Sequence, residues 1–204
     1  MTNKIDPLFI VVEGIDGVGS TTCSKLLVQL LQSYGNEALW TKEPSDGTIG
    51  RHIRRVLKHQ ESASEASMFP LFLADRHDHI ESTIIPELFQ GSTVVCDRYF
   101  PSTWVYQQDN YDKLLIEQMH RNALAPDYIF ILLATVEECR KRMGQREDRE
   151  RYEIEELQRR YAVRYSEYGP HLPRIGHEKI VHIDTMYLSA EEVAIAMARN
   201  IGLL

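Results

Sequence analysis

Basic residues are outnumbered in this chain. Among its 204 residues, 23 lysines and arginines stand against 30 aspartates and glutamates, so the formal net charge is −7. Proteins that bind nucleic acid normally carry a basic surplus, because they must neutralise phosphates. The charge balance therefore argues against a nucleic-acid partner, although it leaves room for a local basic site.

Cysteine is also scarce. Cys23, Cys96 and Cys139 are odd in number, widely spaced and outside any paired metal-ligand pattern. Such residues neither staple a small secreted domain nor form a structural zinc site. We interpret them as reduced, mostly buried side chains of an intracellular protein.

Long apolar runs are missing as well. The first run, Leu8–Val12, lies between charged residues and is too short for a signal-peptide core or a membrane span. We therefore expect no targeting segment, no membrane partner and a cytoplasmic location. Because no linker, repeat or low-complexity segment divides the chain, residues 1–204 are predicted to form a single domain with its own core.

The chain does contain a regular alternation of short apolar runs and longer amphipathic stretches. The runs rich in β-branched and aromatic residues, which indicate buried strands, are 8–12, 37–41, 93–96, 128–133 and 180–183. Apolar stripes at helical spacing lie between or after them, at 26–34, 49–57, 114–124 and 193–201. This alternation predicts an α/β fold, a five-stranded parallel sheet flanked by helices.

A glycine-rich turn, residues 14–22, separates the first strand from the first helix. Its glycines let several backbone N–H groups point at one anion, and the helix N-terminus adds partial positive charge. The turn fits the P-loop frame G-x-x-x-x-G-K-[ST] and so predicts a three-layer P-loop NTPase fold. The residues expected to bind ATP are Gly14, Gly17, Val18, Gly19, Ser20, Thr21 and Thr22.

One position departs from this frame, because Ser20 stands where the P-loop lysine is expected. That lysine normally reaches the β and γ phosphates as a point charge, whereas serine supplies a hydrogen bond without charge. The strand before and the helix after favour phosphate binding over a tight turn without a nucleotide. They do not restore the missing charge.

Further polar residues follow the second and third predicted strands. Lys42 lies in a Thr-Lys-Glu-Pro segment, and Asp97 and Arg98 directly follow the third strand. The carboxyl ends of neighbouring parallel strands share one edge of the sheet, where ligands of such folds bind. Asp97 suits a magnesium ion and Arg98 suits a phosphate, although an ordinary strand exit and a surface ion pair are the alternatives.

Two further features have both a structural and a functional interpretation. Phe72 and Arg76 are four residues apart on one face of a predicted helix, where they could stack on a base and hydrogen-bond its edge. On spacing alone, Phe72 is more typical of a core residue. The segment Arg140–Arg164 holds nine basic and six acidic residues, which makes it either a solvated helix face or a phosphate-binding cover.

Taken in order, these motifs resemble the thymidylate kinase (dTMP kinase) family of P-loop nucleoside monophosphate kinases. The resemblance extends from Phe9 to about Ala198, and its most family-specific part is the Asp-Arg-Tyr-x-x-Ser-x-x-x-Tyr-Gln run that begins at Asp97. Pro126-Asp127 and Arg151-Tyr152-Glu153 also fit. The resemblance implies transfer of phosphate from ATP to dTMP with Mg²⁺, and a homodimer.

The resemblance also implies roles for individual residues. The expected acceptor site has Phe72 on the thymine ring, Arg76 at its edge, Ser102 and Gln107 near the base, Tyr106 against the sugar, and Lys42 and Arg98 on phosphate. The expected metal ligands are Thr21 and Asp97. The expected catalytic residues are Asp16, Arg98, Arg146 and Arg149, the last two in a helical lid at about 140–153.

The chain departs from the family pattern in three places. Ser20 replaces the P-loop lysine, Lys42 replaces an arginine, and Leu133 stands where an acid is common. Our hypothesis is that Arg146 and Arg149 supply part of the charge missing at Ser20, because phosphoryl transfer depends mainly on electrostatic stabilisation.

Three alternatives share much of this pattern. The acceptor could be another deoxynucleotide or a deoxynucleoside, although deoxynucleoside kinases usually carry Glu-Arg-Ser in place of Asp97-Arg98-Tyr99. The chain could also be a non-catalytic nucleotide-binding protein disarmed at Ser20. Turnover with a panel of acceptors separates the first two, and nucleotide binding without product formation identifies the third.

Overall fold

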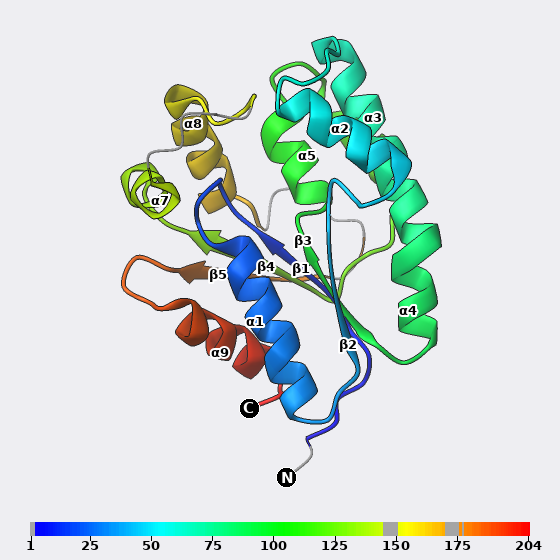
Figure 1. Cartoon of the computed structure of the whole chain (residues 1–204), viewed down its shortest axis with the longest axis vertical. Helices are drawn as coiled ribbons and strands as arrows, with labels where there is room; N and C mark the ends of the chain where they lie inside the picture. The colour runs from blue at the N-terminus through cyan, green and yellow to red at the C-terminus, as the bar shows by residue number, and fades with distance from the viewer. Residues whose placement is uncertain (1–2, 145–150, 170–175, 177) are drawn as a thin grey trace.

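Five short parallel strands form the centre of the molecule, in the order β2-β3-β1-β4-β5. The computed structural model describes residues 3–144, 151–169, 176 and 178–204. The strands are β1 (Phe9–Glu13), β2 (Ala38–Lys42), β3 (Thr93–Asp97), β4 (Tyr128–Leu133) and β5 (Lys179–Asp184). All five lie within one or two residues of the predicted runs, so the predicted sheet is confirmed (Figure 1).

Helices flank this sheet, as predicted (Figure 1). Helix α1 (Ser20–Ser33) packs against α9 (Ala190–Asn200) and against β2 and β3. The helices between β2 and β4 are α2 (Thr48–Leu57), α3 (Glu65–His79), the π-helical turn η1 (Ile80–Ile84), α4 (Ile85–Phe89), α5 (Phe100–Gln107) and α6 (Lys113–His120). Helices α7 (Val136–Met143) and α8 (Glu155–Ser166) lie between β4 and β5. Residues 145–150 of the predicted lid lie outside the described residues.

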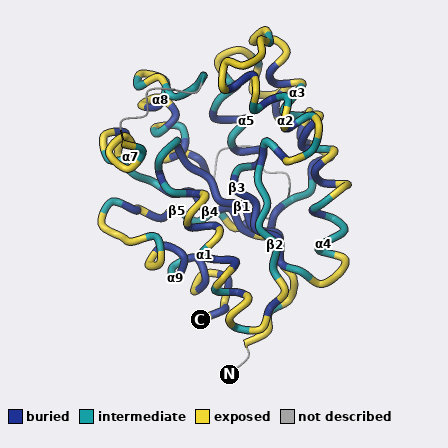
Figure 2. The backbone as a smooth tube through the Cα atoms, in the orientation of Figure 1, coloured by how far each residue is buried: buried dark blue, intermediate teal, exposed yellow. Residues whose placement is uncertain are grey.

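Strands β1, β3 and β4 are almost entirely buried, which explains their continuous apolar sequences (Figure 2). A second, smaller apolar cluster joins α2 to α3. No helix within the described ranges is long and apolar enough to cross a membrane. Because the strands are parallel, the polar residues at their carboxyl ends gather at one edge of the sheet, where the P-loop also lies.

Helix α6 carries part of the predicted apolar stripe on its exposed side. Leu114, Leu115 and Met119 are 59%, 42% and 43% exposed, whereas the buried residues of this helix are Ile116 and His120. The helix therefore exists as predicted. Its buried side is formed by Ile116 and His120, which lie four residues apart on one face.

Candidate active site

The P-loop takes the conformation that its glycines allow. Gly17 and Gly19 have φ angles of +82° and +102°, and a Cβ atom added at Gly17 would lie 2.5 Å from the carbonyl oxygen of Cys139. Gly19 is the residue that precedes helix α1, so the first turn of the helix opens directly onto the loop. Residues 16–22 line a cleft of about 780 Å³, together with residues of α7 and of the loop after β5.

This cleft collects nearly all the residues predicted to bind ATP. Gly17 to Thr22 line it, whereas Gly14 does not line it and accepts a hydrogen bond from Arg98 through its carbonyl oxygen. Ser20 is nearly buried and brings no charge. The cations that line this cleft, among the residues that the structure describes, are Arg98 and Arg142.

Arg142 is a cleft residue that motif matching missed. Its guanidinium donates to the carbonyl oxygen of Val18 (3.1 Å) and to Oγ1 and the carbonyl oxygen of Thr185 (3.0 and 2.8 Å). Arg142 therefore ties helix α7 to the P-loop and to the segment after β5. The only sequence signal was its place in the basic segment, within which Arg146 and Arg149 lie outside the described residues.

The two predicted metal ligands are in contact. Thr21 Oγ1 donates to Asp97 Oδ2, and Asp97 Oδ1 is buried without a hydrogen-bond partner in the described part of the chain. A hydroxyl next to an unsatisfied carboxylate oxygen fits Mg²⁺, which takes one or two protein oxygens and completes its shell with water and phosphate. The described residues hold no group of three or more His, Cys, Asp or Glu side chains that could bind a metal. Mg²⁺ does not require one.

A second, smaller cleft of about 140 Å³ adjoins the first. Six of the seven residues predicted to bind the acceptor line it, namely Phe72, Arg76, Arg98, Ser102, Tyr106 and Gln107. Asp16, Arg98 and Glu153 line both clefts. The two predicted binding regions therefore meet at an acidic and basic pair at the edge of the sheet.

Arg98 lies at this junction and has an unusual backbone conformation, with a φ angle of +73°. Its Nη2 donates to Asp16 Oδ1 at 2.6 Å, and its Nη1 donates to the Gly14 carbonyl oxygen at 2.8 Å and to the Tyr106 hydroxyl at 3.1 Å. Left-handed backbone at a non-glycine residue is costly and is found mainly where the surroundings enforce it. The P-loop and the turn after β3 thus hold the guanidinium between the two clefts.

Glu13, a fully buried acid at the end of β1, secures the turn after β3. It accepts hydrogen bonds from the Tyr99 backbone N–H (2.8 Å), the Ser102 hydroxyl (2.8 Å) and the Tyr165 hydroxyl (2.8 Å). Burial raises the pKa of Glu13, while the Arg98 charge and these hydrogen bonds oppose the rise. Its one sequence signal was an acid that ends an apolar strand.

Gln158 of α8 secures Asp16. Its Oε1 accepts from the Asp16 backbone N–H (3.2 Å) and its Nε2 donates to Asp16 Oδ2 (2.8 Å) and to the Tyr152 carbonyl oxygen (2.9 Å). Gln158 thereby connects the end of the predicted lid to the P-loop acid. Nothing in the sequence distinguishes this glutamine from a surface residue of an amphipathic helix.

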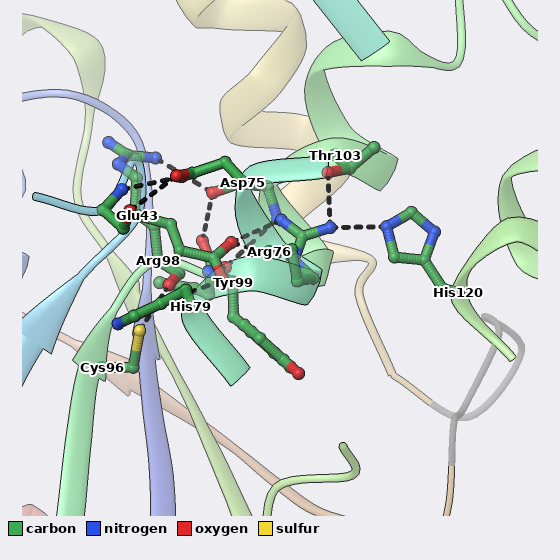
Figure 3. A network of polar contacts seen from close by, with 12 residues as sticks. Glu43, Asp75, Arg76, His79, Cys96, Arg98, Tyr99, Thr103 and His120 are labelled. Atoms are coloured by element: carbon green, nitrogen blue, oxygen red, sulfur yellow. Dashed lines mark hydrogen bonds and ion pairs between the residues drawn. The ribbon is translucent and has the colours of Figure 1, made fainter. Parts of the chain in front are cut away.

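The far end of the smaller cleft is built around Arg76, which is only 1% exposed (Figure 3). Its Nε and Nη2 donate to Glu43 Oε2 at 2.9 and 2.7 Å, and its Nη1 donates to Thr103 Oγ1 at 3.0 Å and to His120 Nε2 at 2.5 Å. Gln107, also 1% exposed, has a buried Oε1 without a hydrogen-bond partner among the described residues. Phe72 lies in the same cleft.

The Lys42-Glu43-Pro44 segment contributes differently from the expectation. Glu43 is the buried partner of Arg76 and also lies 3.4 Å from His79 Nδ1 (Figure 3). Lys42, expected to bind substrate, pairs with Asp46 at 3.6 Å and lines neither of the two clefts. Its role on phosphate stays a prediction.

The basic segment is extensively paired in its described part. Arg140 contacts Glu155, Arg151 contacts Glu65, Arg159 contacts Glu137 and Glu155, and Arg160 and Arg164 contact Asp109. The local surplus of positive charge is thus largely compensated by acids of neighbouring elements. Arg151 also donates to the carbonyl oxygen of Ala63, so the end of the predicted lid rests on the α2–α3 connection.

Comparison with known proteins agrees with this geometry. The family model for thymidylate kinase matches residues 12–194. A probable thymidylate kinase of Methanocaldococcus jannaschii is 35% identical, covering 93% of each chain. A probable thymidylate kinase of Pyrococcus horikoshii is 37% identical over 82% of this chain and 85% of its own. A thymidylate kinase of Pelotomaculum thermopropionicum is 34% identical over 94% and 96%.

The fold is matched by a solved structure of thymidylate kinase from Candida albicans, with a TM-score of 0.78. The match covers 98% of this chain and 93% of that chain at 22% sequence identity. Such identity is too low to transfer roles of single residues. It does support the P-loop fold that the glycine-rich turn predicted.

Proposed function

Since this chain belongs to the thymidylate kinase family, we propose that it transfers the γ-phosphoryl group of ATP to dTMP, giving dTDP and ADP. In this step the bond between the γ-phosphorus and its bridging oxygen to the β-phosphorus breaks. A new bond forms between the same phosphorus and an oxygen of the dTMP phosphate. The larger cleft is assigned to ATP and the smaller cleft to dTMP.

The observation that carries this proposal is that one N–H donor of Arg76 and one acceptor oxygen of Gln107 have no hydrogen-bond partner among the described residues. Both residues line the smaller cleft. The contacts of Arg76 use four of the five N–H groups of an arginine, and Gln107 Oε1 has no partner among the described residues. A base that satisfies both presents a carbonyl oxygen beside an N–H group. Thymine does so with O4 and N3–H, whereas cytosine presents an amino group and a bare ring nitrogen there.

Phe72 and Tyr106 supply the flat and bulky parts of the site. Phe72 offers an aromatic face in the smaller cleft, and Tyr106 packs against Tyr161 and Tyr152 with ring centroids 4.4 and 5.6 Å away. A tyrosine wedged between other rings has little room to move. We assign Tyr106 to the sugar, where it favours deoxyribose over ribose.

On the donor side, the P-loop N–H groups and the start of α1 hold the phosphates. When bound at Thr21 and Asp97, Mg²⁺ would neutralise phosphate charge. Arg98 lines both clefts, which supports its assignment to phosphate of both nucleotides. Asp16 fixes one edge of Arg98 and so orients its remaining donors. Phosphoryl transfer depends on this kind of alignment and charge neutralisation more than on covalent catalysis.

The charge missing at Ser20 is assigned to Arg146 and Arg149. We expect Arg146→Ala and Arg149→Ala each to lower kcat by about tenfold or more, since positioned cations contribute on that scale. Ser20→Lys should recover part of the loss in either variant. If neither arginine variant nor Ser20→Lys changes kcat in steady-state assays, this assignment is wrong.

A coupled assay for ADP release tests the function. We expect release that depends on both ATP and dTMP, and that stops when Mg²⁺ is chelated. Calorimetric titration of each nucleotide provides the control. Binding of both nucleotides without ADP release would identify a non-catalytic nucleotide-binding protein instead.

We further propose that the protein is a cytoplasmic homodimer. The exposed apolar side chains Leu114, Leu115 and Met119 on α6, and Phe89 on α4, support a contact between two copies. Light scattering after size exclusion tests this directly. A monomer at micromolar concentration would contradict the homodimer.

A further inference from the structure

Arg76 is held by residues from three other parts of the chain. Glu43 follows β2, Thr103 lies on α5, and His120 is the last residue of α6 (Figure 3). Both bonds to Glu43 end on the same oxygen, Oε2. A guanidinium bound to one oxygen can pivot about it, unlike one bound to both oxygens of a carboxylate. The orientation of Arg76 therefore depends on the partners of its Nη1.

His120 is one of these two partners, and its hydrogen bonds define its protonation. Its Nδ1 lies 2.6 Å from the carbonyl oxygen of Ile116. A carbonyl oxygen only accepts, so Nδ1 carries the proton and Nε2 presents its lone pair to Arg76, 2.5 Å away. Burial, reinforced by the Arg76 charge, lowers the pKa of His120 to about 3. The ring is thus a neutral acceptor and adds no positive charge beside Arg76.

The imidazole is also fixed in place by its surroundings. His120 is 3% exposed, and its ring stacks on Phe69 with centroids 6.0 Å apart, while Phe100 lies 6.1 Å away. A ring enclosed in this way cannot turn without disturbing the core. The lone pair of Nε2 therefore has a fixed position relative to the cleft.

We propose that His120 is a positioning residue for base recognition: as a neutral acceptor it fixes the guanidinium of Arg76, so that the one N–H of Arg76 without an acceptor among the described residues meets the carbonyl oxygen of the acceptor base. The inference rests on the proposed function, because it requires a base with a carbonyl at that edge. His120 itself does not touch the base. It acts at the opposite nitrogen of the guanidinium, and Thr103 acts with it.

His120→Leu and His120→Gln test this. Leucine fills similar space without an acceptor, whereas the glutamine oxygen can take the place of Nε2. We expect His120→Leu to raise the KM for dTMP by about tenfold, the scale of one buried hydrogen bond to a charged group, with kcat and the KM for ATP within about twofold. His120→Gln should lie within about threefold of the wild type. Thr103→Val removes the other acceptor of Nη1 and should resemble His120→Leu.

The ratio of kcat/KM for dTMP to that for dCMP distinguishes a positioning role of His120 from a general loosening of the fold. His120→Leu should reduce this ratio, whereas a merely loosened fold lowers activity with both nucleotides alike. His52→Leu, at a partly exposed histidine that pairs with Glu61 and lines neither cleft, is the matched control and should keep the wild-type ratio. Thermal melting identifies a variant that fails to fold. In that case the KM for dTMP of His120→Gln and Thr103→Val still tests the proposal.

Nitrogen-15 spectra that separate the two ring nitrogens provide a readout independent of activity. They should show His120 protonated at Nδ1 alone from pH 5 to 8. A charged ring, or proton transfer to Nε2, overturns the inference. So does a His120→Leu variant with unchanged KM and unchanged base preference in an active wild-type background. If the wild-type protein is inactive with dTMP, the proposed function is wrong, and this inference, which rests on it, is wrong too.

Discussion

The two clefts that meet at Asp16 and Arg98 are built in contrasting ways. The smaller cleft includes buried side chains, among them the charged pair of Arg76 and Glu43. The P-loop side of the larger cleft is shaped by backbone in conformations that favour glycine, as at Gly17 and Gly19. A site that must distinguish one base from another needs fixed side-chain donors and acceptors, whereas a site for phosphates common to all nucleotides can use peptide N–H groups.

This difference explains why Ser20 can be tolerated in the proposed enzyme. The geometry of the P-loop comes from its glycines and from helix α1, and neither depends on the side chain at position 20. Replacing the lysine removes charge but leaves the anion-binding shape. By contrast, loss of one partner in the smaller cleft leaves a buried polar group unpaired, which costs more than an average hydrogen bond.

The junction between the clefts should be the most sensitive point. We expect Arg98→Gln to lower kcat/KM by about a thousandfold, because it removes the charge shared by both clefts. Arg159→Gln, at an exposed arginine paired with Glu137 and Glu155, is the control and should leave turnover unchanged. Steady-state kinetics with both nucleotides varied measures the effect. If Arg98→Gln changes kcat/KM no more than Arg159→Gln does, Arg98 does not serve both clefts.

The backbone of the larger cleft comes next. Gly17→Ala places a Cβ atom against the carbonyl oxygen of Cys139, and we expect it to lower kcat/KM for ATP by about a hundredfold. Gly91→Ala is a matched control, because Gly91 has a similar φ angle of +88° with nothing within 4 Å of the added atom. This control variant should lose about 1 kcal/mol of stability and keep the wild-type kcat/KM for ATP. Equal kinetic effects of the two variants would contradict the role given to the P-loop backbone.

The side chains of the smaller cleft allow a test in which stability and binding move in opposite directions. Gln107→Leu removes a buried oxygen that has no partner within the described residues. We expect the free energy of unfolding to stay level or rise by up to about 1 kcal/mol, while the KM for dTMP rises about tenfold. Urea denaturation and steady-state kinetics measure the two. If stability falls, Gln107 serves the fold and not the base.

The last test concerns acid stability, which leaves the kinetics of both clefts aside. Because the folded state holds the pKa of His120 at about 3, below the usual value of 6.5, the unfolded chain binds a proton there first as the pH falls. Stability contributed by this residue is complete above pH 6.5 and is lost towards pH 3, by about 1.4 kcal/mol per pH unit at most. His120→Gln should therefore lose less stability between pH 6.5 and 5 than the wild type in urea titrations. Parallel curves would argue against a buried neutral His120.

Local patterns were enough to predict the sheet and the P-loop. Strands β1, β3 and β4 are continuous buried runs, and glycine spacing reports backbone conformation directly, as at Gly17. The family resemblance added the side chains of the smaller cleft, among them Phe72 and Gln107, and the structure brings them together. Their roles in binding remain proposals.

The residues that sequence reasoning missed act across long distances in the chain. Glu13 bonds Tyr165, and His120 bonds Arg76, between elements far apart in sequence. A single sequence does not show which buried polar residue meets which. On α6 the apolar stripe alone did not distinguish core from interface, and the structure buries Ile116 and His120 while Leu114, Leu115 and Met119 are exposed.

The most direct test of the whole account is the acceptor preference of the wild-type protein. Purified enzyme with ATP and Mg²⁺ is given dTMP, dUMP, dCMP, dGMP or thymidine, and each product is identified by anion-exchange chromatography. The donor and acceptor left by Arg76 and Gln107 predict that dTMP is converted to dTDP and that dCMP is used at least about a hundredfold less efficiently, on the scale of mismatched buried hydrogen bonds. Equal use of dCMP and dTMP, or phosphorylation of thymidine alone, would contradict it.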